Sequence, residues 1–585
     1  MYSSEKNVQI LISLMKKNNI KKVIISPGSA NLSFVGSIQC DSFFELYSCV
    51  DERSAAYMAC GMSEECGEPV AISCTGATAS RNYLPALTEA YYRKLPILAI
   101  TSTRRLSMIA QNVDQVIDRT QIQNDVAKIS VTLPVVVDEN TEWECNLKVN
   151  EALLELNHRG KGPVHINLVT SYSTDFHANR LPDTRLIQRF TTCDNATIPS
   201  GKKVAVFVGS HSCFHPELTD AVDEFCDKYD GFVICDQTSN YKGKFGIYLG
   251  LLNLEENSEL SKLECDILIH IGNVSAIWPP ISKEIWRVNP DGIIRDTYKK
   301  LTKVFEMDEV SFFSGMSEKR NISCVKTYKL AKAIYEKSYL RLSKEVENLP
   351  FSSLWIALKS HRLLPSESVI HFGILNSLRC WSCFELEKSI RSYSNVGGFG
   401  IDGGVSSLIG AAISNPKRLF FGVFGDLAFF YDMNSLGNRH IKNNVRIMII
   451  NNGLGVEFKR SDINVQKAGL GDLANSFISA EGHYGRKSKT LVKNYAESLS
   501  FLYMSSTTKE EFERLTGDFF SKTSDRPIVF EVFVDEHDDS NSLSFLKSLA
   551  KGENTHNNTM DRTKQIAKSF LGEKGISAIK KMINK

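Results

Sequence analysis

Two apolar segments in the C-terminal half of the chain each end in a polar oxygen donor. Leu419–Phe424 leads into Asp426, and Ile447–Ile450 leads into Asn452, with one helical segment between them. Strands joined by a helix are parallel, so both donors are expected at the carboxyl edge of one sheet, where open α/β sheets bind ligands. Mg²⁺ prefers hard oxygen ligands and leaves positions for phosphate oxygens. Together with a nearby backbone carbonyl, Asp426 and Asn452 predict a magnesium-diphosphate site.

Glu52 is a second candidate, far away in the sequence. It lies between an apolar strand, Phe43–Val50, and an alanine-rich helix. Small and apolar neighbours would partly bury its carboxyl group and raise the pKa, so that it could share a proton with a heterocyclic nitrogen near neutral pH. The alternative is that Asp51 and Glu52 only stabilise the first turn of the helix through its dipole.

The composition is that of an ordinary globular protein of several domains. The chain has 585 residues, 42% of them hydrophobic, and a net charge of +2, so nothing indicates nucleic-acid binding. No apolar run is long enough to cross a membrane, and Met1–Asn19 reads as an amphipathic helix of the mature protein rather than a signal peptide. Most of the 14 cysteines lie singly in apolar segments, which predicts reduced thiols and a cytoplasmic protein. The pair Cys380 and Cys383 is interpreted as two ordinary thiols.

Alternating strand and helix patterns predict an α/β fold with three doubly wound parallel-sheet domains. Short glycine-bearing turns follow most of the expected strands, and a polar segment, residues 173–202, reads as a linker. The expected domains are residues 1–180 with Glu52, residues 200–315 in the middle, and residues 346–540 with the metal site. Residues 541–585 are expected to form a polar and basic helical tail.

Several short motifs occur in the order typical of thiamine-diphosphate enzymes, and the chain resembles this family. Within it, the chain is most similar to the menaquinone-pathway synthase that joins decarboxylated 2-oxoglutarate to isochorismate, and more distantly to acetohydroxyacid synthases. The likeness is good over residues 20–120 and 376–458, and rests on length and strand order between them. The motifs are Ser26-Pro27-Gly28-Ser29, Asp51-Glu52-Arg53, Thr75-Gly76-Ala77-Thr78-Ala79 with Asn82, Ile401-Asp402-Gly403, and Gly425-Asp426 with Asn451-Asn452.

The resemblance implies a role for each matching residue. Thiamine diphosphate would lie between two subunits, its diphosphate on a Mg²⁺ ion held by Asp426, Asn452 and the carbonyl of Leu454. Glu52 of the partner subunit would hydrogen-bond the aminopyrimidine ring, and Ile401 would hold the cofactor bent. The smallest active form would be a homodimer, with a homotetramer also possible. Further cofactor contacts would come from Gly400, Asp402, Gly425, Leu427, Ala428, Thr75 and Asn82, and substrate contacts from Ser29, Arg104, Gln115 and Ser377.

Three arginines of the menaquinone-pathway enzyme are replaced in this chain. Ala30, Trp381 and Val396 stand at their positions, although Arg379 lies close by in the sequence. Arginine side chains bind carboxylates through paired hydrogen bonds, so these changes argue against a dianionic donor and a dicarboxylate acceptor. We therefore expect decarboxylation of a small 2-oxo acid such as pyruvate, with transfer of the acyl unit to an acceptor or, alternatively, simple decarboxylation.

Two readings from other classes compete with this one. Gly398–Gly403 fits the GxGxxG pattern and Asp426 ends the next strand, which would suit a nicotinamide dehydrogenase but leaves Asn452 and the N-terminal motifs unexplained. A non-catalytic scaffold is the other reading, and the presence of Glu52, Asp426 and Asn452 together speaks against it.

Overall fold

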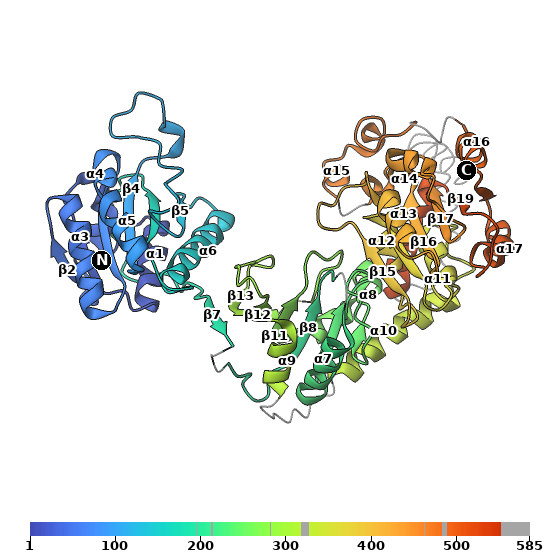
Figure 1. Cartoon of the computed structure of the whole chain (residues 1–585), viewed down its shortest axis with the longest axis horizontal. Helices are drawn as coiled ribbons and strands as arrows, with labels where there is room; N and C mark the ends of the chain where they lie inside the picture. The colour runs from blue at the N-terminus through green and yellow to red at the C-terminus, as the bar shows by residue number, and fades with distance from the viewer. Residues whose placement is uncertain are drawn as a thin grey trace, which may run out of the picture. The chain divides into compact units, whose positions relative to one another are not determined.

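The computed structural model describes residues 1–585 except 193, 195, 212–213, 281, 318–326, 461–462, 483–487 and 552–585. The chain forms two compact units (Figure 1). Unit 1 comprises Met1–Asn195 and Glu284–Met307, and unit 2 comprises Ala196–Lys283 and Asp308–Lys585. In the described residues, the strand pairs with a known register are parallel in each of the chain's three sheets, which confirms the predicted α/β class. Among the described residues, no helix combines the length and the apolar character needed to cross a membrane.

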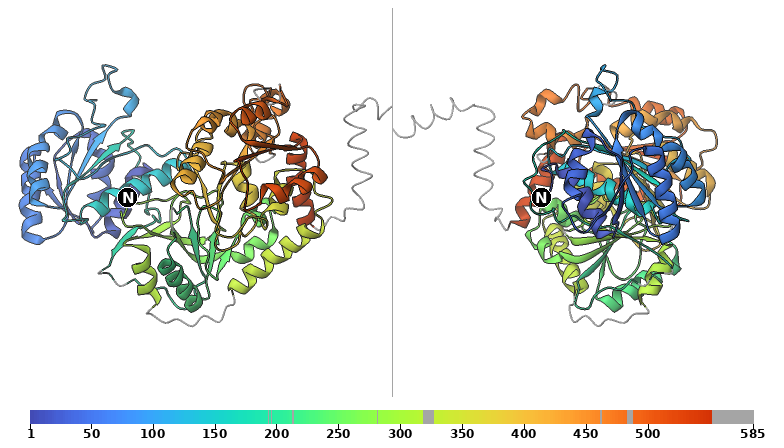
Figure 2. Two further views of the ribbon diagram at one scale, coloured as in Figure 1. Left: turned by 45° about the vertical axis from the view of Figure 1, so that its right-hand side comes forward. Right: turned by 90° about the vertical axis from the view of Figure 1, so that its left-hand side faces the viewer.

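The first sheet belongs to unit 1 and has the order β2-β1-β3-β4-β6-β5. Helices cover both of its faces (Figures 1 and 2). Alternate residues of β3 serve different faces: Ile72 packs in a cluster with α3 and α5, whereas Ala71 packs in a cluster with α1 and α6. The strands are β1 (Lys22–Ile25), β2 (Glu45–Ser48), β3 (Val70–Thr75), β4 (Ile97–Thr103), β5 (Ser130–Leu133) and β6 (Val164–Val169). The helices are α1 (Lys6–Lys17), α2 (Leu32–Ile38), α3 (Glu52–Cys66), α4 (Ala77–Asn82), α5 (Leu84–Arg93) and α6 (Glu139–Glu155).

The middle sheet has strands in both units. Unit 2 contributes four, in the order β10-β9-β8-β11, and unit 1 contributes three, in the order β12-β13-β7. The strands are β7 (Gln188–Thr191), β8 (Val204–Val208), β9 (Phe232–Cys235), β10 (Gly246–Ile247), β11 (Cys265–Ile271), β12 (Ser282–Val288) and β13 (Leu301–Glu306). The helices are α7 (Pro216–Tyr229), α8 (Gly250–Glu255), α9 (Glu309–Ser317) and α10 (Thr327–Lys344).

The third sheet lies in unit 2 and has the order β15-β14-β16-β17-β19-β18. Along β16, Phe421 and Val423 pack into a core with α11, α17 and α18, and Phe420 and Phe424 pack into a core with α13 and α14. The strands are β14 (Val369–Phe372), β15 (Arg391–Ser394), β16 (Phe420–Gly425), β17 (Val445–Asn451), β18 (Leu502–Ser506) and β19 (Ile528–Phe533). The helices are α11 (Ser353–Ser360), α12 (Asn376–Trp381), α13 (Gly404–Ser414), α14 (Asp426–Asp432), α15 (Asn464–Lys467), α16 (Leu491–Ser498), α17 (Lys509–Phe519) and α18 (Glu536–Ala550).

Two segments differ from the sequence-based expectations. The expected linker, residues 173–202, contains the edge strand β7, whose sequence Gln-Arg-Phe-Thr carries too little apolar pattern to indicate a strand. The expected tail from residue 541 begins inside α18, where Leu546 and Leu549 are buried in the core. The rest of that tail, from residue 552, lies outside the described residues.

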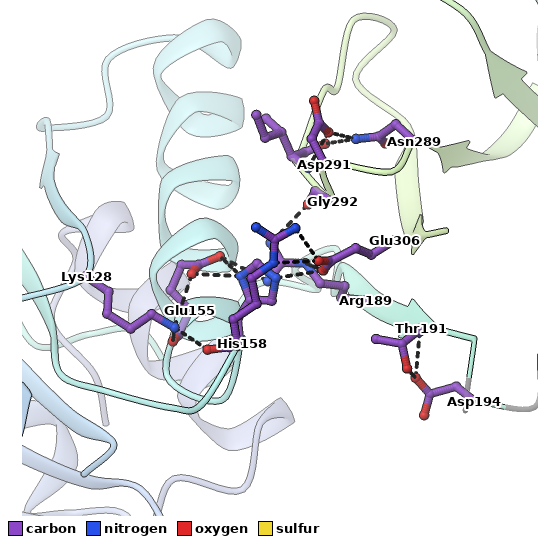
Figure 3. Close-up of polar contacts among 12 residues, drawn as sticks. Lys128, Glu155, His158, Arg189, Thr191, Asp194, Asn289, Asp291, Gly292 and Glu306 are labelled. Carbon is purple, nitrogen blue, oxygen red and sulfur yellow. Dashed lines mark hydrogen bonds and ion pairs between the residues drawn. The ribbon is translucent and has the colours of Figure 1, made fainter. Parts of the chain in front are cut away.

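A cluster of charged side chains fixes β7 and β13 to the end of α6 within unit 1 (Figure 3). His158 follows α6, and its Nε2 lies 2.6 Å from Glu306 on β13. Arg189 on β7 lies 3.0 Å from Glu155, and Arg159 donates a 2.7 Å hydrogen bond to Glu306. These polar contacts, together with the stacking of Phe190 on Phe305, hold the edge strand in place.

Candidate functional site

Asp426 is the first residue of α14 and directly follows β16, as predicted. Its carboxylate is buried and accepts backbone hydrogen bonds from Leu427 (2.9 Å) and from Gly453 (2.8 Å). Among the described residues, no cation forms an ion pair with it. Burial therefore raises the pKa of Asp426 to about 7. A buried carboxylate without a counter-charge is a suitable partner for a divalent cation.

Asn452 follows β17 at the same edge of the sheet, since β16 and β17 are adjacent and parallel. Its side-chain nitrogen donates a 3.1 Å hydrogen bond to Asp539 on α18. Asp539 also accepts a 2.6 Å hydrogen bond from the backbone of Ser353, and Ser353 in turn accepts one of 3.0 Å from Asn376. Burial raises the pKa of Asp539. Sequence reasoning missed Asp539, because the acidic first turn of α18 looks like an ordinary helix start.

The loop after Asn452 turns back toward Asp426. Gly453 has a φ of 77°, in the left-handed region that favours glycine, and this conformation lets its amide reach Asp426. Leu454, whose carbonyl is the predicted third ligand, is buried beside it. The loop is closed by a 2.6 Å hydrogen bond from the amide of Gly455 to the carbonyl of Ser479.

This donor set suits Mg²⁺. It offers a carboxylate, an amide oxygen and a backbone carbonyl, all hard oxygen donors, and leaves positions for phosphate oxygens. In the part of the chain that the structure describes, no cluster of three or more His, Cys, Asp or Glu side chains could hold a metal ion, so a transition-metal site is not indicated here.

The loop from Asn395 to Gly403 joins β15 to α13 near this edge. Asn395 and Ser407 hold its ends through reciprocal hydrogen bonds of 3.1 and 3.2 Å. Ile401 is half-buried and packs on the core of the third sheet, whereas Gly400 and Asp402 are exposed. The exposed part of the loop also includes the apolar side chain of Phe399, and the cofactor role of Gly400, Ile401 and Asp402 stays a prediction.

Glu52 opens α3 in unit 1 and is half-buried. Asp51 caps the helix by accepting a 3.1 Å hydrogen bond from the amide of Ser54, so the helix-start reading is correct for Asp51. Glu52 instead accepts a 3.3 Å hydrogen bond from the side chain of Asn82, one of the predicted cofactor residues. The two residues come from different motifs, and the fold brings them together.

Two of the motifs, the one that begins at Ser26 and the one that begins at Thr75, also lie in contact in unit 1. A Cβ on Gly28 would lie 2.0 Å from the side chain of Thr75, so only glycine allows the two loops to approach this closely. Ser29, next to Gly28, is exposed and available to a ligand. Arg104 lies over the ring of Tyr172 and 3.3 Å from Asp114.

Gln115, the other substrate residue predicted in unit 1, is exposed and has a φ of 60°.

Ser377 is buried at the start of α12, beside Asn376 of the hydrogen-bond network around Asp539. Two residues further along α12, Arg379 forms two hydrogen bonds with Glu457, of 2.5 and 2.9 Å. Glu457 also lies 3.3 Å from Arg460. Both terminal nitrogens of Arg379, Nη1 and Nη2, are therefore paired with Glu457, a constraint that no sequence pattern revealed. The three positions where arginines are replaced, Ala30, Trp381 and Val396, are buried, with 4, 0 and 3% exposure.

Comparison with known proteins tests the family resemblance independently of the structure. Residues 6–122 match the family model described as thiamine pyrophosphate enzyme, N-terminal TPP binding domain. Similar curated proteins are 2-succinyl-5-enolpyruvyl-6-hydroxy-3-cyclohexene-1-carboxylate synthases. That of Phocaeicola vulgatus is 32% identical, covering 93% of this chain and 98% of the relative. Those of Bacteroides thetaiotaomicron (31%; 93 and 98%) and Desulfotalea psychrophila (26%; 88 and 96%) are also similar.

The chain belongs to this synthase family of thiamine pyrophosphate enzymes. The family confirms the resemblance read from the motifs, and with it thiamine diphosphate as the cofactor and an enzyme of the decarboxylating, carbon–carbon bond-forming type. Because the cofactor is thiamine diphosphate, the GxGxxG pattern at Gly398–Gly403 is not evidence for a nicotinamide site.

Cys380 and Cys383 are buried free thiols, and burial raises the pKa of Cys380 to about 12.

Proposed function

We propose that this protein is a Mg²⁺- and thiamine-diphosphate-dependent enzyme that decarboxylates a small 2-oxo acid and transfers the acyl unit to an acceptor. The observation that carries the choice of substrate is the ion pair between Arg379 and Glu457. It occupies the arginine nearest to Ser377 in α12 and so removes a cation that could bind a second carboxylate of the substrate.

The protein's own residues would have the following roles in the reaction. Asp426, Asn452 and the Leu454 carbonyl hold the metal, and Asp539 orients the amide of Asn452 through the 3.1 Å hydrogen bond. Glu52, whose carboxylate accepts a hydrogen bond from Asn82, would hold the proton that is shared with the aminopyrimidine ring of the cofactor. Bound thiamine diphosphate supplies an electron sink for loss of CO₂ from a 2-oxo acid.

The cations that remain available suit a substrate with one carboxylate. Among the described residues, Arg104 has one ion pair, at 3.3 Å to Asp114, whose side chain is 77% exposed, besides its contact with the ring of Tyr172. A substrate carboxylate can compete for such an exposed pair. Arg379 faces a Glu457 that is only 14% exposed. Breaking that pair would leave a charge poorly solvated. One carboxylate can thus be bound at little cost and a second cannot.

The relatives' own product, a 2-succinyl-cyclohexene-carboxylate, defines a second candidate. It is favoured by 32% identity over 93% of this chain. In that case the donor would be 2-oxoglutarate and the acceptor isochorismate, and both substrates would need cations beyond Arg104.

One assay distinguishes the two candidate reactions. We would measure CO₂ release by the Mg²⁺- and thiamine-diphosphate-loaded protein from pyruvate, 2-oxobutanoate and 2-oxoglutarate, with and without aldehyde and ketone acceptors. The proposal requires a higher kcat/KM with pyruvate or 2-oxobutanoate. A preference for 2-oxoglutarate, with a coupled product only when isochorismate is present, would establish the relatives' reaction instead.

Release of CO₂ without any coupled product would identify a simple decarboxylase. Release from none of the acids would contradict the proposal as a whole. The homodimer or homotetramer, the cytoplasmic location and the absence of nucleic-acid or membrane partners stay predictions.

A further inference from the structure

A cavity of about 530 Å³ lies in unit 2, away from the metal loop. One wall is formed by the start of α7 and the loop after β9, and the other by residues at the amino ends of β14, β15 and β16. Ligands of open α/β sheets bind at the carboxyl ends of strands, so the amino ends used here belong to no cofactor crevice of the third sheet. The cavity has no role in the proposed reaction.

Four cationic side chains line this cavity, and they are Lys242, Lys388, Arg391 and Arg418. Within the described part of the chain, none of the four has an ion pair or a side-chain hydrogen bond. Only two acidic residues, Asp220 and Glu367, line the same cavity, and both are exposed. The residues that line the cavity therefore carry a surplus of positive charge, although Glu385 and Glu387 act on Lys242 from outside the lining.

Lys242 is half-buried, and among the described residues it has no ion pair and no side-chain hydrogen bond. Burial lowers its pKa, although Glu385 and Glu387 act in the opposite sense. The loop that carries it is packed tightly: a Cβ on Gly243 would lie 2.3 Å from Asp223, and that carboxylate accepts a 3.1 Å hydrogen bond from the amide of Lys244. The backbone on the C-terminal side of Lys242 is thus fixed in position.

Hydrogen bonds join the two walls of the cavity beside the cationic side chains. Asn240 donates hydrogen bonds to the carbonyls of His211 (3.0 Å) and Ser392 (3.1 Å), and it accepts one of 3.0 Å from the amide of Ser392. Ser392 is the neighbour of Arg391. The side chain of Gln237 adds bonds of 3.1 and 2.6 Å to the carbonyls of Trp381 and Phe384. A ligand would meet a preformed cavity, which lowers the entropy cost of binding.

The lining is not only cationic. Phe214, Ile390 and Tyr393 add apolar surface, and α7 begins at the cavity with Pro216 in its first turn and no side-chain cap. An uncapped helix start offers free amide donors to an anion. Cations, free amides and a flat apolar wall in one cavity suit a molecule that carries both a phosphate group and an aromatic or other flat apolar part.

We propose that this cavity binds a small phosphorylated metabolite, with Arg391 and Arg418 contacting its phosphate and Tyr393 contacting its apolar part. Arginine pairs well with phosphate through two parallel hydrogen bonds, and the two arginines lie at the start of β15 and just before β16, the strands that flank β14 on its two sides. A bound anion would also connect the middle and third sheets of unit 2 across the seam at Asn240.

The test is isothermal titration of the Mg²⁺- and thiamine-diphosphate-loaded protein with phenyl phosphate, with inorganic phosphate and benzoate as parallel probes. Saturating the cofactor site first keeps the phosphate probes out of it. Phenyl phosphate is expected to bind more tightly than either of the other two. The double variant Arg391→Gln/Arg418→Gln is expected to weaken its binding about tenfold or more.

Lys417→Gln is the matched control, because Lys417 is exposed next to Arg418 but does not line the cavity. It should bind phenyl phosphate as the parent protein does. Thermal unfolding would verify that the double variant folds, and Lys388→Gln, at an exposed position, gives a second and milder substitution. Absence of saturable binding, equal binding by the double arginine variant and the parent protein, or benzoate binding as tight as phenyl phosphate would overturn the proposal.

Discussion

The side-chain amide of Asn452 and the carboxylate of Asp539 are joined by a 3.1 Å hydrogen bond across 87 residues of sequence. The bond sets which side of the Asn452 amide presents oxygen, since its nitrogen faces Asp539. Asp539 is itself held by Ser353 through two hydrogen bonds. Helix α18, which carries Asp539, thereby orients a side chain of the predicted metal site.

Replacing Asp539 by alanine should therefore weaken Mg²⁺-dependent binding of thiamine diphosphate by about tenfold, because the Asn452 amide loses its partner. It should also lower the free energy of unfolding by about 1–3 kcal/mol, the cost of buried donors without an acceptor. Asp539→Asn keeps the shape and one acceptor, so its loss should be smaller. Titration of cofactor at several Mg²⁺ concentrations measures the effect. An unchanged Mg²⁺ dependence in both variants would show that Asp539 does not position Asn452.

Asp426→Asn should raise the apparent Kd of the cofactor at fixed Mg²⁺ by about a hundredfold, since the metal loses its only carboxylate ligand. Asp432→Asn is a useful comparison, because Asp432 is also buried but bonds to Ser406 within the same domain. Fluorescence titration with Mg²⁺ and thiamine diphosphate distinguishes the two. Similar Kd values for Asp426→Asn and the parent protein would remove Asp426 from the metal site.

Glu457→Gln should release Arg379 for substrate carboxylates. The ratio of kcat/KM for 2-oxoglutarate to kcat/KM for pyruvate is expected to rise about tenfold, the gain of one charge-assisted hydrogen-bond pair. Lys459→Gln serves as control, because Lys459 pairs with the exposed Asp472 and not with Arg379. If the ratio moves equally in both variants, the Arg379–Glu457 pair does not govern substrate choice.

His165 predicts a pH dependence of stability in unit 1. It is buried between Thr101 and Ser130, at 2.7 and 2.8 Å, and burial lowers its pKa to about 3. Between the ordinary value of 6.5 and 3, the unfolded chain binds a proton that the folded chain does not. Stability should thus fall as pH falls through this range, by up to about 1.4 kcal/mol per pH unit from this residue.

Urea unfolding at several pH values tests this effect. His165→Gln should flatten the pH dependence, whereas His440→Gln, at an exposed position, should leave it as it is. A slope that is the same in all three proteins would contradict the assignment to His165.

The sheets and the metal-binding strand ends could be predicted from the sequence because each rests on a local pattern. The apolar segments predicted as strands, Leu419–Phe424 and Ile447–Ile450, correspond to β16 (Phe420–Gly425) and β17 (Val445–Asn451). Asp426 and Asn452 follow adjacent parallel strands, so periodicity and strand order suffice to bring them to one edge.

The parts that escaped prediction depend on long-range contacts or on weak local signals. Edge strand β7 is polar, and its partner β13 lies more than a hundred residues later in the chain. Asp539 and Glu457 act through side chains whose partners no spacing rule connects to them. The replaced arginines were visible in the sequence, but only the structure shows that the neighbouring Arg379 is already paired.

Exchange of the C2 proton of bound thiamine diphosphate for deuterium tests the central claim most directly, because it needs no knowledge of the substrate. The parent protein should accelerate the exchange over free cofactor, and Glu52→Gln should reduce that acceleration by about a hundredfold or more, the usual contribution of a proton-transfer group. Exchange that the parent protein does not accelerate, or acceleration that Glu52→Gln leaves intact while cofactor is bound, would contradict the account.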